Sequence, residues 1–150
     1  MYSIEVENLK EIQEAFTRAP LLVSSELIKG VKEAGKVVLR TEKKEAPVGK
    51  TGLLRRTIAM DYAPISVKIY PTREYAGYVH EGTGIYGKRN DYIRPVNAKV
   101  LAFKVGGKMI FTKKVKGQKA NPFVERTANI VASPINTIFN NVLKNIVKKI

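Results

Sequence analysis

The stretch "KVLAFKVGGKMIFTKKV", residues 99–115, carries the clearest structural signal in the chain. Two runs rich in aliphatic, aromatic and β-branched residues flank Gly106 and Gly107. Glycine adopts the positive φ angles that two-residue hairpin turns require. The stretch therefore predicts an antiparallel hairpin whose turn is Gly106-Gly107.

The N-terminal side of this hairpin is predicted to be mostly helical. "YSIEVE", residues 2–7, alternates apolar and polar side chains and predicts a short strand. A first helix is expected to reach about Arg18. Pro20 is expected to separate it from a second helix that runs to about Glu45 and ends before Pro47.

The remaining patterns predict two strands, a short helix or turn, an irregular loop and a C-terminal helix. Asp61 to Pro64 are expected to form the reversal between the two strands, and Pro134 to kink or bound the last helix. In chain order these elements cover residues 57–63, 65–71, 73–84, 83–98 and 122–150.

This order of elements predicts an α+β fold rather than alternating βαβ units. We expect an N-terminal strand and two helices, a small antiparallel sheet with an extended β-hairpin, and a C-terminal helix packed on the sheet. A chain of 150 residues is expected to form a single domain, 1–150. Its parts would be the strand and helices (1–46), the sheet with a basic loop and long hairpin (47–119), and the C-terminal helix (120–150).

Composition excludes several classes of protein. The chain has no cysteine, which rules out disulfides and thiolate metal sites. Its longest unbroken apolar run is "VLAF", residues 100–103, whereas a membrane span needs about 20 residues. The first twenty residues lack an apolar core segment, so no secretory signal is expected.

The positive charge is large and unevenly distributed. The formal net charge is +14, and residues 88–119 alone carry ten basic and one acidic side chain. Such a segment attracts polyanions by releasing their counterions. Solubility and contact with acidic neighbouring subunits explain the same charge equally well.

"EAPVGKTGLLRR", residues 45–56, ends in a way that is similar to a phosphate-binding loop. That loop needs a first glycine five positions before the Gly-Lys pair, and Lys44 stands there. It should also follow a buried strand, whereas this stretch follows a charged amphipathic helix. A nucleotide site is therefore not expected at Gly49, Lys50 and Thr51.

The titratable residues do not form an evident catalytic group. His80 is the only histidine, and neither a nucleophile nor further metal ligands lie at suitable spacing. The carboxylates outside the N-terminal third are scattered without pairing. We expect no enzyme activity, no cofactor and no metal.

The basic hairpin is the main candidate for function. A two-stranded basic ribbon can follow a phosphate backbone without reading bases. Few exposed aromatic residues are expected beside the lysines, which argues against stacking on single strands. The DNA-facing or partner-facing basic patch is predicted to consist of Lys88, Arg89, Lys104, Lys108, Lys113, Lys114, Lys116 and Lys119.

The Gly82–Gly84 triplet and the C-terminal helix each allow two interpretations. Gly82, Thr83 and Gly84 could cradle an anion with their backbone N–H groups or form a tight turn. The C-terminal helix is apolar on more than one stripe, so it either lies fully within its own core or also contacts a second subunit. The subunit contact would use Ile138, Phe139, Val142 and Ile146.

Several motifs occur together in a recognisable order. They are "APVGKTGLLRRTI" (46–58), "YAGYVHEGTG" (75–84), "IRP" (93–95) and "LAFKVGGKMIFTKKVKGQKANPFVERTA" (101–128). In this order the chain resembles the tailed-bacteriophage family of minor tail, neck or tail-completion components, typified by the gene-ten product of a lambdoid phage. The resemblance covers nearly the whole chain. It departs from the family pattern at His80 and in the basic stretch after "EGTG".

The resemblance implies a virion structural protein that assembles as a homo-oligomeric ring at the head–tail junction or tail, from subunits made in the host cytoplasm. Other neck or tail proteins would be its neighbours, and DNA passing through the ring would touch it transiently. It also implies structural roles for the motif turns and for the "PF" that anchors the last helix. These positions are Gly49, Gly52, Gly82, Thr83, Gly84, Gly106, Gly107, Pro122 and Phe123.

Two functions therefore compete. One is a non-enzymatic structural component of a phage or prophage particle. The other is a free, sequence-independent nucleic-acid-binding protein that uses the same basic hairpin. Binding to DNA at physiological salt separates them.

Overall fold

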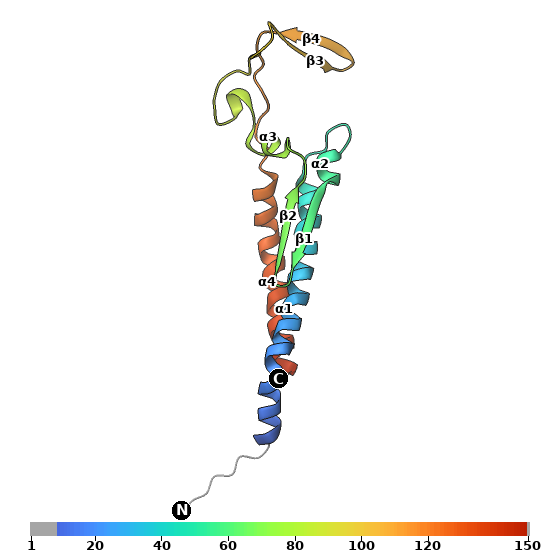
Figure 1. The fold of residues 1–150 in the computed structure, drawn as a ribbon, viewed down its shortest axis with the longest axis vertical. Coiled ribbons are helices and arrows are strands. Elements are labelled where there is room, and N and C mark those ends of the chain that lie inside the picture. Colours follow the sequence, from blue (N-terminus) through green and yellow to red (C-terminus); the bar gives the residue numbers. More distant parts are fainter. Residues whose placement is uncertain (1–8, 150) are drawn as a thin grey trace, which may run out of the picture. The chain divides into compact units, whose positions relative to one another are not determined.

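The computed structural model describes residues 9–149 and confirms the α+β class (Figure 1). Long helices stand at both ends of this range, and four short strands and the shorter helices lie between them. The predicted strand at residues 2–7 lies outside the described residues.

One helix, α1 (Leu9–Glu45), replaces the two that the sequence predicted. The expected break at Pro20 is wrong, because Pro20 lies inside α1. An interior proline removes one backbone hydrogen bond and crowds the preceding turn, at a cost of about 3 kcal/mol. That single local penalty does not divide a helix of 37 residues whose other turns keep their hydrogen bonds.

The described residues group into two compact units. The first unit contains residues 9–41, 60–69 and 129–149, and the second contains 42–59 and 70–128. We call them the first unit and the second unit.

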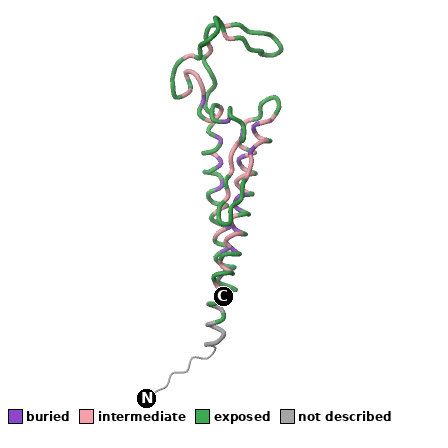
Figure 2. The backbone as a smooth tube through the Cα atoms, in the orientation of Figure 1, coloured by how far each residue is buried: buried purple, intermediate pink, exposed green. Residues whose placement is uncertain are grey.

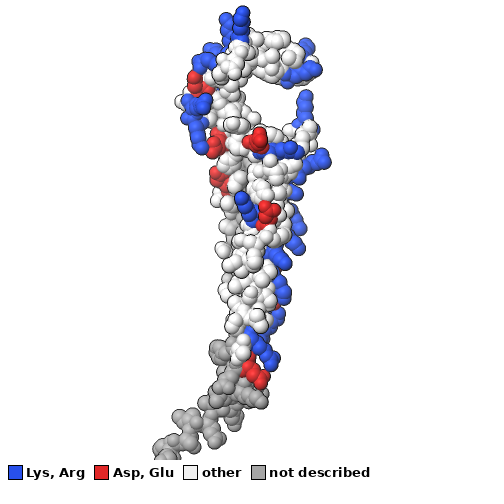
Figure 3. Space-filling model, in the orientation of Figure 1, with Lys and Arg blue, Asp and Glu red and all other residues white. Residues whose placement is uncertain are grey.

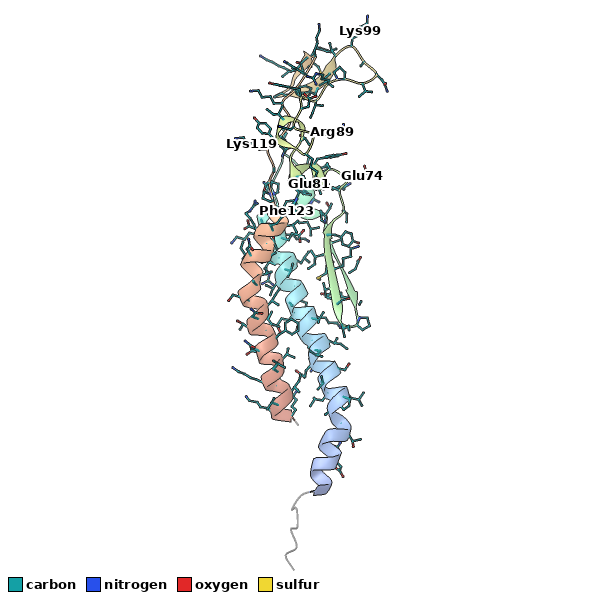
Figure 4. The ribbon with its side chains drawn as sticks, turned by 90° about the vertical axis from the view of Figure 1, so that its left-hand side faces the viewer. Glu74, Glu81, Arg89, Lys99, Lys119 and Phe123 are labelled. Atoms are coloured by element: carbon teal, nitrogen blue, oxygen red, sulfur yellow. The ribbon has the colours of Figure 1, made fainter. Side chains whose placement is uncertain are left out.

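In the first unit, α1 packs against α4 (Phe123–Lys149), and the two helices lie side by side in both views (Figures 1 and 4). Gly30 permits the close approach, because a Cβ at this position would lie 2.6 Å from the Val142 Cγ2 atom. The ring of Phe139 lies next to the same point. Buried residues therefore recur along both helices (Figure 2).

A buried carboxylate joins the two helices of the first unit. Glu26 is almost fully buried and accepts hydrogen bonds from Lys29 at 2.8 Å and Lys149 at 2.9 Å. Hydrogen bonding to these two ammonium groups lowers the pKa of Glu26 to about 2. The carboxylate thus stays ionised and ties the end of α4 to α1.

The face predicted for subunit contact lies in this core instead. Ile138, Val142 and Ile146 are buried within the chain, and Phe139 is half-buried. The reason is that their helical spacing directs them at α1. The large apolar side chains that α4 leaves exposed in the first unit are Ile130, Leu143 and Val147.

The strands β1 (Ile58–Ala63) and β2 (Ser66–Pro71) form a two-stranded sheet. Their connection is Pro64 and Ile65, so the predicted reversal over Asp61 to Pro64 began too early. Val67 of β2 contacts Gly35 of α1, where a Cβ would approach the valine to 2.8 Å. A glycine in α1 therefore positions this sheet in the first unit.

In the second unit, two arginines cap the C-terminal end of α1. Arg55, in the short helix α2 (Leu53–Arg56), donates hydrogen bonds to the carbonyls of Lys44 and Ala46 at 2.9 and 3.0 Å. Arg126 of α4 donates to the carbonyl and the carboxylate of Glu45 at 3.2 and 3.1 Å. The last carbonyls of a helix lack partners of their own and attract cations. The "EAPVGKTGLLRR" stretch thus ends one helix and supplies part of its cap.

Gly49 to Gly52 form a turn rather than a phosphate loop. The Gly52 N–H donates to the Gly49 carbonyl at 3.1 Å, and Gly52 has a left-handed φ of 61° immediately before α2. Leu54 and Ile58, just beyond the turn, are buried, whereas Leu53 is half-buried. The stretch therefore ends α1 and leads directly into α2.

Candidate interaction surface

The candidate surface is a segment of the second unit, residues 88–119, which we call the arm. It contains the hairpin of β3 (Leu101–Val105) and β4 (Lys108–Thr112). An isolated bridge between Ile93 and Val115 pairs its two flanking segments. The short helices α3 (Ala76–Glu81) and η1 (Gly84–Tyr86) precede it.

The base of the arm is closed by backbone hydrogen bonds. The N–H groups of Thr83 and Ile85 donate to the carbonyls of Gln118 and Lys116 at 2.8 and 2.9 Å. The Gln118 N–H donates in return to the Thr83 hydroxyl at 2.9 Å. The Thr83 N–H of the Gly82-Thr83-Gly84 triplet thus already has a partner, and the triplet forms a turn that closes the base of the arm. We call this contact of residues 82–85 with 116–118 the crossing.

The crossing requires glycine at two positions. A Cβ on Gly84 would lie 2.2 Å from the Lys116 carbonyl oxygen, and one on Gly117 would lie 2.2 Å from the Thr83 carbonyl oxygen. Both glycines also have positive φ angles, of 62° and 90°. Any side chain would separate the two backbone segments.

Beside the crossing, α3 contacts the first turn of α4. The His80 Nε2 and Glu125 Oε2 atoms are 2.5 Å apart, and the His80 ring packs edge-on against Phe123 at 5.6 Å. Phe123 is only 1% exposed. This burial agrees with the anchoring role expected of the "PF" motif. His80 contacts both Glu125 and Phe123 and so links α3 to the start of α4.

The hairpin has the predicted strands and turn. Its register pairs Val105 with Lys108 and Phe103 with Ile110. Gly106 and Gly107 have φ angles of 58° and 86°, as the two-residue turn requires.

The hairpin leaves its large apolar side chains exposed on both faces, and Figure 2 marks most of its residues as exposed. Phe103, Val105 and Ile110 lie on one face and Met109 and Phe111 on the other, because facing pairs alternate. Phe111 is 65% exposed. The expectation of few exposed aromatic residues is therefore wrong. The prediction failed because the sequence of a strand shows that it is apolar but does not show whether another element of the fold covers it.

The predicted basic patch lies on this arm, and all eight of its residues are exposed (Figure 3). Three make specific contacts. Lys88 donates to Glu81 at 2.7 Å and lowers the pKa of that carboxyl, while Lys114 and Lys119 lie over the rings of Tyr92 and Tyr86. Figure 4 shows Lys119 and Arg89 at about the same height above Phe123, and Lys99 farther along the arm. The patch follows the arm rather than gathering at one point.

Within residues 9–149, no cluster of three or more His, Asp or Glu side chains could hold a metal ion. The helices in the same range include none that is long and apolar enough to cross a membrane. The chain matches no protein-family model, and no curated protein or solved structure matches it.

Proposed function

We propose that the chain is a non-enzymatic structural component of a tailed phage or prophage particle. It would form part of an oligomeric ring at the head–tail junction through which DNA passes. The arm carries this proposal: it is strongly basic, it exposes apolar side chains on both hairpin faces, and the crossing fixes its base. Large apolar side chains exposed together on one hairpin are typical of a protein contact.

Each part of the arm has a distinct role in this proposal. The apolar side chains of the hairpin contact neighbouring subunits, where their burial supplies most of the binding free energy. The lysines face DNA or acidic protein surfaces and make contacts that do not depend on sequence. The net charge of +14 disfavours self-association in solution, which is consistent with a subunit that assembles only on a template.

Immunogold electron microscopy on particles induced from the source organism tests the proposal. Antibody against the chain should place gold at the head–tail junction or along the tail. Intact tailed particles that carry no gold would remove the chain from the virion and contradict the proposal.

A second candidate function is sequence-independent nucleic-acid binding by the free protein. The exposed aromatic rings of Phe103 and Phe111 favour it, because they stand among lysines on the hairpin and can stack on bases. A dedicated binder with 6–10 phosphate contacts loses roughly 10³–10⁵ in affinity between about 50 and 200 mM salt. Submicromolar binding at physiological salt would favour this function over the first.

The arm lysines can be tested directly with a triple variant in which Lys113, Lys114 and Lys116 become Gln. If they contact phosphates, the salt dependence of DNA binding should fall by a slope of about 3. The matched control removes three exposed lysines of the first unit, namely Lys32, Lys36 and Lys144. Equal loss in both variants would show that only total charge matters.

A further inference from the structure

The second unit contains an apolar pocket beside the base of the arm. Its volume is about 420 Å³. The turn that follows α1 supplies one side, α2 and α3 supply apolar side chains, and one residue comes from the crossing. The lining residues are Pro47, Val48, Gly49, Thr51, Leu53, Leu54, Tyr75, Val79 and Gln118.

The pocket is open to solvent and retains apolar surface there. Val48 is 59% exposed and Tyr75 is 43% exposed, whereas Leu54 at its base is buried. Five of the nine lining residues are exposed. Small-molecule sites bury most of their ligand. A site as open as this one is better suited to a protruding side chain of a larger partner.

Charge selects the kind of partner. Three basic residues, Lys50, Arg55 and Lys119, stand directly next to lining residues in sequence, against one acidic residue, Glu74. The second unit as a whole carries seventeen basic and six acidic side chains. A second copy of this chain would bring the same excess of positive charge to the pocket, so an acidic partner complements it better.

We propose that this pocket docks an acidic peptide segment of another protein, with one or two bulky apolar side chains inserted between Val48, Leu54 and Tyr75. The pocket supplies apolar burial, and Lys50 attracts the flanking carboxylates. Gln118 is the one lining residue that belongs to the arm, and the site does not depend on the function proposed for the arm.

The probe is a short fluorescein-labelled peptide rich in Glu and Asp, with a Leu and a Phe spaced one helical turn apart. It should bind the full chain, and backbone amide signals of Val48, Gly49 and Thr51 should shift in a ¹H–¹⁵N NMR titration. A second peptide keeps the carboxylates but replaces Leu and Phe by Ser. It should bind at least about tenfold more weakly, since two apolar anchors are lost.

Two pocket variants and two matched controls complete the test. Val48→Asp should weaken binding about tenfold, and Lys50→Glu about threefold. Val96→Asp and Lys99→Glu make the same changes at exposed positions of the arm and should leave binding within about twofold. Circular dichroism and thermal unfolding show that each variant is folded.

Four outcomes would overturn the proposal. Equal binding of the Ser peptide, or equal weakening by the arm variants, would mean that charge alone attracts the peptide. Absence of peptide binding would exclude an acidic partner. Self-association that Val48→Asp abolishes would assign the pocket to a second copy of the chain. None of these results bears on the gold labelling of particles. The pocket proposal and the proposed function can therefore fail independently of each other.

Discussion

The α1–α4 pair and the arm use apolar residues in opposite ways. In the first unit, the two helices bury Val142 and Ile146, and even their buried charge, Glu26, has two partners. In the arm, Phe103 and Phe111 remain exposed on a two-stranded ladder. Isolated hairpins are at best marginally stable, so the arm depends on the crossing at its base. The comparison teaches that helix packing holds the first unit together, whereas a few glycine-dependent contacts hold the arm.

The largest expected effect comes from breaking the crossing. Gly84→Ala places a Cβ 2.2 Å from the Lys116 carbonyl oxygen at a positive φ, so we expect a loss of about 2–4 kcal/mol in the free energy of unfolding. Denaturant unfolding measures the loss, and hydrogen exchange should show it at Thr83, Ile85 and Gln118. Gly106→Ala is the control, because it also has a positive φ but no atom within 4 Å. It should lose about 1 kcal/mol. Equal losses would mean that backbone strain, not the close approach, matters at Gly84.

A smaller effect is expected from crowding the helix pair. Gly30→Ala should destabilise the protein by about 1–3 kcal/mol, because the new methyl group meets Val142 at 2.6 Å. Gly77→Ala, in α3, has open space and should instead stabilise by about 0.5–1 kcal/mol through helix propensity. Thermal unfolding of both variants gives the comparison. Stabilisation by Gly30→Ala would show that the helices separate easily.

The contributions of Glu26 and Glu42 of α1 to stability should change with pH in opposite directions, and that of Glu26 is the larger. The lowered pKa of Glu26 means that its contribution is fully present above its ordinary value of 4.5. That contribution is lost as the pH falls toward about 2. Glu26→Gln should therefore lower stability at neutral pH and flatten the acid limb of a urea-unfolding series. An unchanged acid limb would remove Glu26 from the α1–α4 contact.

The smallest expected effect is at Glu42, in the second unit. Burial raises the pKa of the Glu42 carboxyl above 4.5, so its contribution is present below that pH and is lost as the pH rises through the folded-state value. Glu42→Gln should slightly raise stability at neutral pH and have little effect below about pH 4. The same urea series measures it. A loss of stability at neutral pH would mean that the ionised carboxylate has a favourable partner.

The sequence predicted what depends on neighbouring residues. The Gly106-Gly107 turn, the strands beside it and the short helix before Gly82 follow from local pattern. The break at Pro20 was mispredicted because a local penalty was weighed without the rest of a long helix. The contact of Arg126 with Glu45 joins positions 81 apart in sequence, and no local pattern signals it. The pocket escaped prediction for the same reason, since its walls come from three segments that are separate in sequence.

The crossing also makes the arm a closed loop. It joins Thr83 to Gln118, which lie 35 positions apart. The entropy of closing such a loop grows only with the logarithm of its length, and doubling the length costs only about 0.6 kcal/mol. The space around Gly106 and Gly107 is empty, so an epitope inserted between them should lengthen the loop at little cost in stability. The hairpin tip is thus a natural place for a reporter that follows the chain without disturbing the crossing.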